Sequence, residues 1–146
     1  MSQKSFIPVL RELARAYQAF EAYSAPHIRS LGLTPSQFDI VATLGNTDGM
    51  SFRDLGERTL ITKGTLTGVV DRLEAKNLVR RVASPSDGRS QTVQLTRKGE
   101  TLFAKVFPAH MNHVEKVFSA FSQAELNAME TELHRLRVAL SAASAQ

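Results

Sequence analysis

The chain has 146 residues and contains no cysteine, no tryptophan, and only eight glycines and five prolines. The absence of cysteine excludes disulfide bonds, thiolate metal sites, cysteine nucleophiles and thiol-based redox sensing. No apolar run approaches the ~18 residues that a membrane-spanning helix needs. The N-terminus lacks the apolar core and small-residue cleavage site of a signal peptide. We therefore expect a cytoplasmic protein that does not enter a membrane.

Sequence motifs that mark common enzyme classes are also missing. The chain has no GxSxG elbow, no phosphate-binding Walker loop, no HExxH pair and no clustered pair of acids. Its four histidines are scattered and do not suggest a catalytic triad. We predict that the protein is not an enzyme and needs no cofactor.

The positive charge of the chain is concentrated in its middle third. Overall, 18 basic residues outnumber 14 acidic ones, giving a net charge of +4. Residues 50–100 hold ten of the basic and six of the acidic residues, whereas the rest of the chain is neutral. A basic centre between neutral ends suggests a polyanion-binding module on a neutral scaffold.

Hydrophobic spacing predicts a mainly α-helical fold with one small β-hairpin. Helices are expected over residues 6–31, 35–45, 51–60, 63–76, 97–121 and 122–140, and strands over 79–84 and 91–96. Pro26 should bend or interrupt the first helix and Pro108 should kink the fifth. Thr34 with Gln37, and Ser122 with Glu125, form predicted capping boxes.

Further signals concern the helix ends. Thr62 and Thr96 are predicted to cap the helices that follow them. The tail after Leu140 is expected to fray. Leu126, Met129, Leu133, Leu136 and Leu140 alternate spacings of three and four, which is typical of a helix that pairs with another.

Two short helices followed by a hairpin make the order of a winged helix-turn-helix. We assign residues 34–99 to this DNA-binding part and residues 1–33 and 100–146 to flanking helices that form a homodimer, all within a single chain of residues 1–146. The predicted partner is double-stranded DNA.

The second helix of the pair is the expected recognition helix. Leu66, Val69, Val70 and Leu73 form its inner stripe, so small and hydroxylated residues face outward, where they allow close approach to base edges. The hairpin tip adds Arg89 for the minor groove and Asp87 to orient it. The predicted DNA-binding residues are Arg53, Thr62, Lys63, Gly64, Thr65, Thr67, Gly68, Arg72, Asp87 and Arg89. A net charge of only +4 favours sequence-specific binding, with a sequence-tolerant architectural DNA-binding protein as the alternative.

The same region resembles the MarR (multiple antibiotic resistance regulator) family. The pattern Asp71-Arg72-Leu73-Glu74, then Leu78-Val79-Arg80-Arg81, Asp87-Gly88-Arg89, Val93, Leu95-Thr96 and Gly99 is similar to the family signature. The resemblance implies a homodimeric winged-helix transcription regulator, most often a repressor, that reads a palindrome and is released by a small effector. Asn77 stands where the family commonly has glycine, but asparagine tolerates the left-handed backbone of a helix end.

A ligand pocket is predicted near the kink at Pro108. Its residues are His27, Phe107, His110 and Met111, and its ligand would be an aromatic or phenolic molecule. For Phe107 and Met111 a place in the dimer core is an equal alternative. His110 and His113 have a spacing that can serve a metal ion, but His110 lies on the apolar stripe and no cysteine or acidic cluster accompanies it, so no metal site is predicted.

Overall fold

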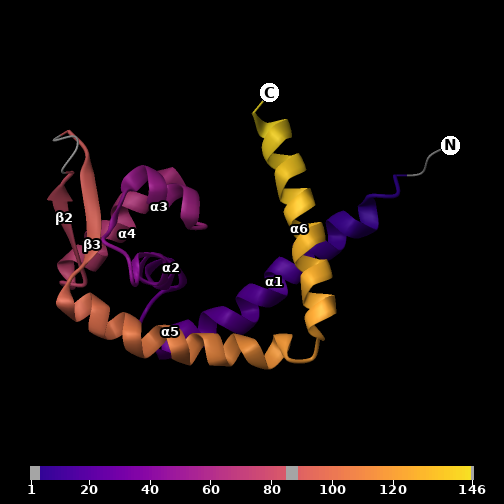
Figure 1. Ribbon diagram of the computed structural model, residues 1–146, viewed down its shortest axis with the longest axis horizontal. Helices are drawn as coiled ribbons and strands as arrows, with labels where there is room; N and C mark the ends of the chain where they lie inside the picture. The colour runs from indigo at the N-terminus through magenta and orange to yellow at the C-terminus, as the bar shows by residue number, and fades with distance from the viewer. Residues whose placement is uncertain (1–3, 85–88, 146) are drawn as a thin grey trace. The chain divides into compact units, whose positions relative to one another are not determined.

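The computed structural model describes residues 4–84 and 89–145, apart from the side chain of Lys63. The chain forms two compact units, one up to His110 and one from Met111. The fold is mainly helical with a small sheet, as the sequence predicted (Figure 1). Its elements are α1 (Ile7–Ser30), α2 (Pro35–Leu44), β1 (Met50–Ser51), α3 (Phe52–Arg58), α4 (Lys63–Ala75), β2 (Val79–Ala83), β3 (Gln91–Leu95), α5 (Arg97–Phe118) and α6 (Gln123–Ser144).

The sheet has three antiparallel strands in the order β1-β3-β2. The hairpin pairs Val79 with Leu95 and Arg81 with Val93, and Met50 of β1 lies opposite Val93 on the other side. Strand β1 was not predicted, because two residues are too short to show an alternating pattern. Strand β1 runs directly into α3 and pairs with β3. The wing, which is the hairpin of β2 and β3, is thereby joined to the helices through β1 as well as through β2, which follows α4.

One hydrophobic core fills the first unit. Helices α2 and α4 and the sheet supply most of it, and the four predicted inner residues of α4 are all buried, with exposed fractions of 4% or less. The fully buried side chains are Ile40, Val41, Leu44, Leu55, Val70, Leu73, Val79, Val93 and Val106. Burial of this stripe fixes which face of α4 remains open.

Most predicted helix ends are confirmed. Thr34 and Gln37 form a reciprocal capping box at α2, Ser122 and Glu125 do the same at α6, and the Gly99 amide donates to the Thr96 hydroxyl at 3.0 Å. Asn77 adopts the left-handed backbone with φ 61°, as its place after α4 requires. Thr62 is different: its hydroxyl lies 2.9 Å from that of Thr65 and makes no capping bond to the backbone.

Helix α1 agrees with the predicted range 6–31 to within one residue at each end, and it is not interrupted at Pro26, because a proline removes one hydrogen bond but does not have to end a helix. Two other predicted helix ends differ from the structure by more than two residues. Helix α5 ends at Phe118 instead of near residue 121, and α6 extends to Ser144, past the tail that was expected to fray. Within the described part of the chain, every helix is too short or too polar to cross a membrane.

Candidate nucleic-acid interface

The outer face of α4 is open and carries small side chains. Thr65, Thr67 and Arg72 are exposed, whereas Gly68 is half-buried. A Cβ atom built at Gly64 or Gly68 would meet none of the described residues outside the helix within 4 Å. Packing within the unit therefore does not require glycine at either position. The face is free for a ligand that must approach the helix backbone closely.

The other predicted residues at the helical end of this surface are also accessible. The Arg53 side chain is 86% exposed and lies 3.5 Å from Glu57, one turn along α3. Thr62 is exposed at the start of α4. The side chain of Lys63 lies outside the described residues, so its contact with DNA stays a prediction.

A half-buried carboxylate holds the turn that precedes α4. The Leu60 backbone amide donates a hydrogen bond to Asp39 Oδ2 of α2 at 2.8 Å. Burial raises the pKa of Asp39, and the bond from Leu60 offsets part of that rise. Leu60 itself is 76% exposed. The backbone of the turn between α3 and α4 is thus attached to α2, whereas the apolar side chain of Leu60 faces outward.

Arg81 connects the wing to the recognition helix. Its guanidinium forms a close ion pair with Asp71 and lies 3.9 Å from Glu74, both on α4. The same group lies over the ring of Phe52 in α3, 5.4 Å from the ring centre. Strand β2 is therefore linked to both helices of the pair by one side chain that is mostly buried.

Sequence reasoning did not identify this role of Arg81. Asp71 is exposed on α4, and the structure gives it a partner in the wing. The signal was present as two acids three residues apart on the helix, followed by two arginines in β2. Successive side chains of a strand point to opposite faces, so only one of Arg80 and Arg81 can face α4. Because both residues are arginine, the sequence alone does not show which one it is.

The described part of the wing is a regular hairpin. The Ser84 amide donates to the Ser90 carbonyl at 3.0 Å, and Arg80 Nε donates to Gln94 Oε1 at 3.0 Å. Arg89 is exposed at the end of the hairpin. Asp87 lies outside the described residues, and so does its predicted contact with Arg89.

A second cluster of polar side chains lies in the same unit, between α1, α2 and α5. His110 is only 2% exposed, and its Nε2 atom lies 2.9 Å from the hydroxyl of Ser24. Its Nδ1 atom lies 2.9 Å from Nδ1 of His27, and the two rings stack with centres 5.1 Å apart. The ring of Phe38 meets His110 edge-on at 4.8 Å. The structure thus brings together two of the four predicted pocket residues and adds Ser24 and Phe38.

Hydrogen bonding in this cluster depends on where its protons lie. A bond between two Nδ1 atoms requires one ring to donate and the other to accept. If both rings were protonated, two N–H groups would point at each other. A neutral His110 can therefore donate to His27 while accepting from Ser24, or the reverse.

The other two predicted pocket residues do not join this cluster. Phe107 stacks on Phe103 and packs against the hydrophobic core. Met111 begins the second unit and is 38% exposed. Their part in a ligand site stays a prediction. Among residues 4–84 and 89–145, no three histidine, aspartate or glutamate side chains are grouped closely enough to hold a metal ion.

Comparison with known proteins gives consistent matches. A family model described as the MarR family matches residues 31–90. The HTH-type transcriptional regulator MhqR of Bacillus subtilis is 34% identical over 142 residues, which cover 97% of this chain and 96% of MhqR.

Two solved structures share the fold over almost the whole chain. AbsC, a MarR family transcriptional regulator from Streptomyces coelicolor, superposes with a TM-score of 0.86 at 23% identity, covering 97% of this chain and 98% of its own. BpsR of Bordetella bronchiseptica, whose DNA binding is regulated by 6-hydroxynicotinic acid, gives 0.76 at 28% identity, with coverage of 93% and 94%.

The Asp71–Arg81 contact can be measured with a double-mutant cycle. We expect Asp71→Asn, Arg81→Gln and the double variant to give a coupling of about 0.5–1 kcal/mol in the free energy of unfolding, since Arg81 is mostly buried. The measurement is urea unfolding at one fixed protein concentration. The matched control is the exposed Glu132–Arg135 pair on α6, where the coupling should be about 0.3 kcal/mol or less. Equal couplings in both cycles would mean that Arg81 does not join the wing to α4.

Proposed function

Because the chain belongs to the MarR family of transcriptional regulators, we propose that it is a repressor that binds a palindromic operator as a homodimer and releases it when a small aromatic effector binds. The matched family and relatives are regulators and not enzymes, in agreement with the sequence prediction. The observation that carries the proposal is the open, glycine- and threonine-rich face of α4. The cytoplasm, where bacterial DNA lies, stays the predicted location.

The composition of the α4 face supports reading of the major groove. Glycine is a poor helix former, costing about 1 kcal/mol relative to alanine, and among the described residues none lies where a Cβ at Gly64 or Gly68 would clash. A surface that must approach base edges explains their presence. Thr65 and Thr67 offer methyl groups to thymine and hydroxyl groups to bases or phosphates. We assign phosphate contact to Arg72, and minor-groove contact to Arg89.

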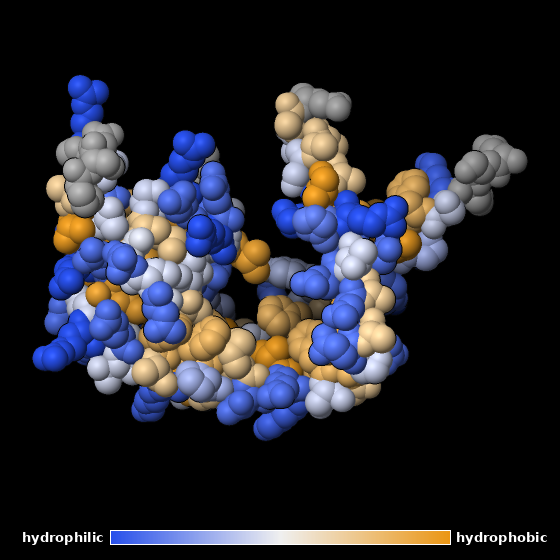
Figure 2. Space-filling view, in the orientation of Figure 1, coloured by the Kyte–Doolittle hydropathy of each residue, from blue (hydrophilic) through white to orange (hydrophobic). Residues whose placement is uncertain are grey.

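Exposed apolar side chains support a homodimer. Contiguous apolar surface on a protein of this size usually marks an interface. Figure 2 shows single orange residues exposed to solvent among the blue ones of α6, and further orange residues exposed on the first unit. The large apolar residues exposed at the start of the chain are Phe6, just before α1, and Val9, Leu10, Leu13, Tyr17 and Phe20 on α1. Those exposed on the second unit include Val117, Phe118, Phe121, Leu133, Val138 and Leu140.

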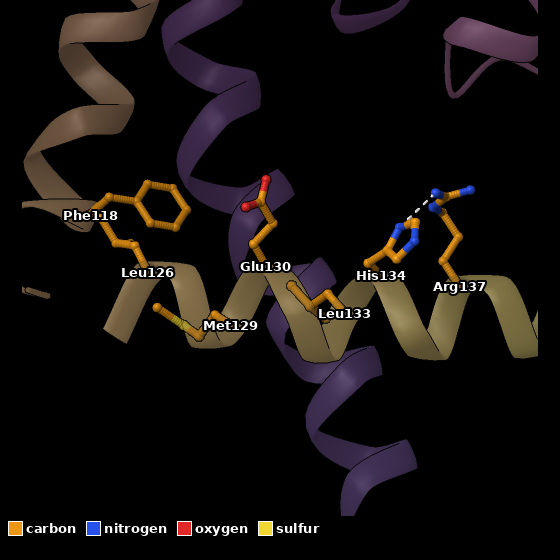
Figure 3. Close-up of a pocket in the computed structure, with 7 residues that line it drawn as sticks. All are labelled: Phe118, Leu126, Met129, Glu130, Leu133, His134 and Arg137. Carbon is orange, nitrogen blue, oxygen red and sulfur yellow. Dashed lines mark hydrogen bonds between the residues drawn. The ribbon is translucent and has the colours of Figure 1, made fainter. Parts of the chain in front are cut away.

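A groove on the second unit supports the same conclusion. It has a volume of about 490 Å³ and is lined by Phe118 at the end of α5 and by one face of α6 (Figure 3). Leu126, Met129 and Leu133 give it an apolar floor, and His134 and Arg137 are hydrogen-bonded at its edge. A helix from a second copy fits the predicted Leu126–Leu140 seam. Two-fold pairing would then present two recognition helices about 34 Å apart, one turn of DNA.

The cluster around His110 supports an effector site. Stacked imidazoles beside Phe38 suit a flat aromatic molecule, and their ring nitrogens suit a phenol or a carboxylate. BpsR, a relative with the same fold, is regulated by a hydroxylated aromatic acid. An effector acts only by binding one state of the dimer more tightly, so DNA must weaken effector binding by the same factor.

Substitutions on α4 separate base reading from close approach. Thr67→Ala should relax preference at one position in each half-site, with a discrimination loss of about 1–3 kcal/mol. Gly68→Ala should weaken binding to all operators, because its Cβ occupies space needed by DNA. In the free protein the same change should raise the free energy of unfolding by about 0.5–1 kcal/mol. Fluorescence anisotropy with matched and mutated operators measures the first two effects, and urea unfolding measures the third.

Salt dependence tests the wing in the same assay. Arg89→Ala should weaken binding to many sequences and lower the salt slope by about one for each phosphate that the arginine no longer neutralises. If Gly68→Ala binds DNA as well as the unmodified chain, α4 does not enter a groove. A salt slope unchanged in Arg89→Ala would exclude the wing contact, and coating of DNA without a preferred site would favour the architectural alternative.

The dimer is tested by a single charge in the groove. Leu133 is 57% exposed in one chain, and Leu133→Asp should convert the dimer to a monomer at micromolar concentration, because an unpaired carboxylate would be buried in the apolar interface. Sedimentation equilibrium measures the change. Leu60→Asp is the matched control, since Leu60 is also exposed but lies in the turn before α4. A dimer that survives Leu133→Asp would place the interface elsewhere.

The effector site is tested by removing the ring nitrogens of His110. With 6-hydroxynicotinate as the probe, His110→Phe should raise the concentration needed to release DNA at least about tenfold, since the variant cannot form a charge-assisted hydrogen bond to the probe. DNA affinity without the probe should change by no more than about twofold. His134→Gln on α6 is the control. If the probe releases DNA from the unmodified chain and from His110→Phe at the same concentration, this cluster is not the effector site.

A further inference from the structure

A basic pocket lies in the first unit, on a face of α5 that the proposed function does not use. Its volume is about 480 Å³, within the range of small-molecule sites. It is formed by the segment after α1, the connection between α4 and β2, and the first turns of α5. The lining residues are Leu31, Gly32, Leu33, Lys76, Leu78, Lys98, Thr101, Leu102 and Lys105.

The charged side chains that line this pocket are all positive. Three lysines line it and no carboxylate does. Within residues 4–84 and 89–145, none of the ion pairs involves these three lysines. The apolar wall of the pocket is held in place by packing, because Leu33 and Leu78 are only 4% and 5% exposed and belong to the hydrophobic core.

Two of the ammonium groups are held in place and retain donors. Lys98 Nζ donates to the backbone carbonyl of Lys76 at 3.1 Å, so the start of α5 is joined to the end of α4. Lys76 Nζ donates to the amide oxygen of the buried Gln37 at 3.4 Å. An ammonium group has three N–H donors, so both lysines can still bind an anion. Lys98, Thr101, Leu102 and Lys105 share one face of α5 by their spacing of three, four and seven.

We propose that this pocket is a second ligand site, which binds a small organic anion that carries a compact negative head on an apolar body. The head would lie among Lys76, Lys98 and Lys105, because lysine acts as a point charge toward phosphate or carboxylate. The body would pack on Leu33, Leu78 and Leu102. This site is separate from the His110 cluster, and its binding does not depend on the proposed DNA-binding function.

Calorimetric titration of the full chain without DNA tests the proposal, with hexyl phosphate as the probe. Hexanol supplies only the apolar chain of hexyl phosphate, and inorganic phosphate supplies only its anionic head. Each should bind at least about tenfold more weakly than hexyl phosphate. Lys98→Gln and Lys105→Gln should each weaken hexyl phosphate about tenfold. Thr101→Phe, which fills the pocket without changing charge, should abolish binding. Circular dichroism confirms that each variant is folded.

Two controls separate a built pocket from general attraction to a basic surface. Arg97→Gln removes a neighbouring charge outside the lining, and His110→Phe alters the other cluster, so both should keep affinity for hexyl phosphate within about twofold. The proposal is wrong if hexyl phosphate does not bind at ~10 mM, or if inorganic phosphate binds as tightly. It is also wrong if Arg97→Gln weakens binding as much as Lys98→Gln, if Thr101→Phe binds normally, or if His110→Phe no longer binds the probe.

Discussion

Burial of one apolar stripe on α4 determines what the rest of the surface can do. Leu66, Val69, Val70 and Leu73 are buried against α2, α3 and the sheet. Burying each such side chain stabilises the fold by about 1.5–3 kcal/mol, whereas a typical polar contact contributes about 1 kcal/mol. No combination of surface contacts could therefore rotate the helix. The glycines and threonines face outward because the core leaves them no other place.

Polar contacts then adjust the position of α4 without supplying much stability. Asp39 holds the turn before the helix through the Leu60 amide, and Arg81 holds Asp71 on the helix itself. Burial raises the pKa of Asp39, so the folded state holds its proton more tightly than the unfolded state. Its contribution to stability is therefore greatest below the unfolded pKa and declines as pH rises through the folded pKa. A carboxylate retained at such a cost is better explained by positioning of the turn than by stability.

Local signals in the sequence predicted much of this structure, whereas contacts between distant segments were not predictable. Some features depend only on residues within one or two helical turns, so the sequence shows them directly. They are the capping boxes at Thr34 and Ser122 and the left-handed backbone of Asn77. Thr62 occupies the N-cap position of α4 as predicted, but its hydroxyl meets that of Thr65 and makes no bond to a backbone amide. The contacts of Arg81 and the paired histidines required chain segments to meet in space. The same limit explains why the lysine pocket was not predicted, since its residues come from three separate segments of the chain.

The start of α5 connects the two regions for which we propose ligands. Gly99 is buried where α5 crosses the start of β2, and a Cβ there would lie 2.1 Å from the Leu78 carbonyl oxygen, so only glycine permits this approach. The close contact fixes the first turns of α5 against the end of α4. One face of these turns carries Lys98 and Lys105, and the core-facing side continues through Val106 to His110. Ligands on the two faces would therefore act on the same helix. Any coupling between them would be reciprocal, because each could alter the other only through the states that this helix adopts.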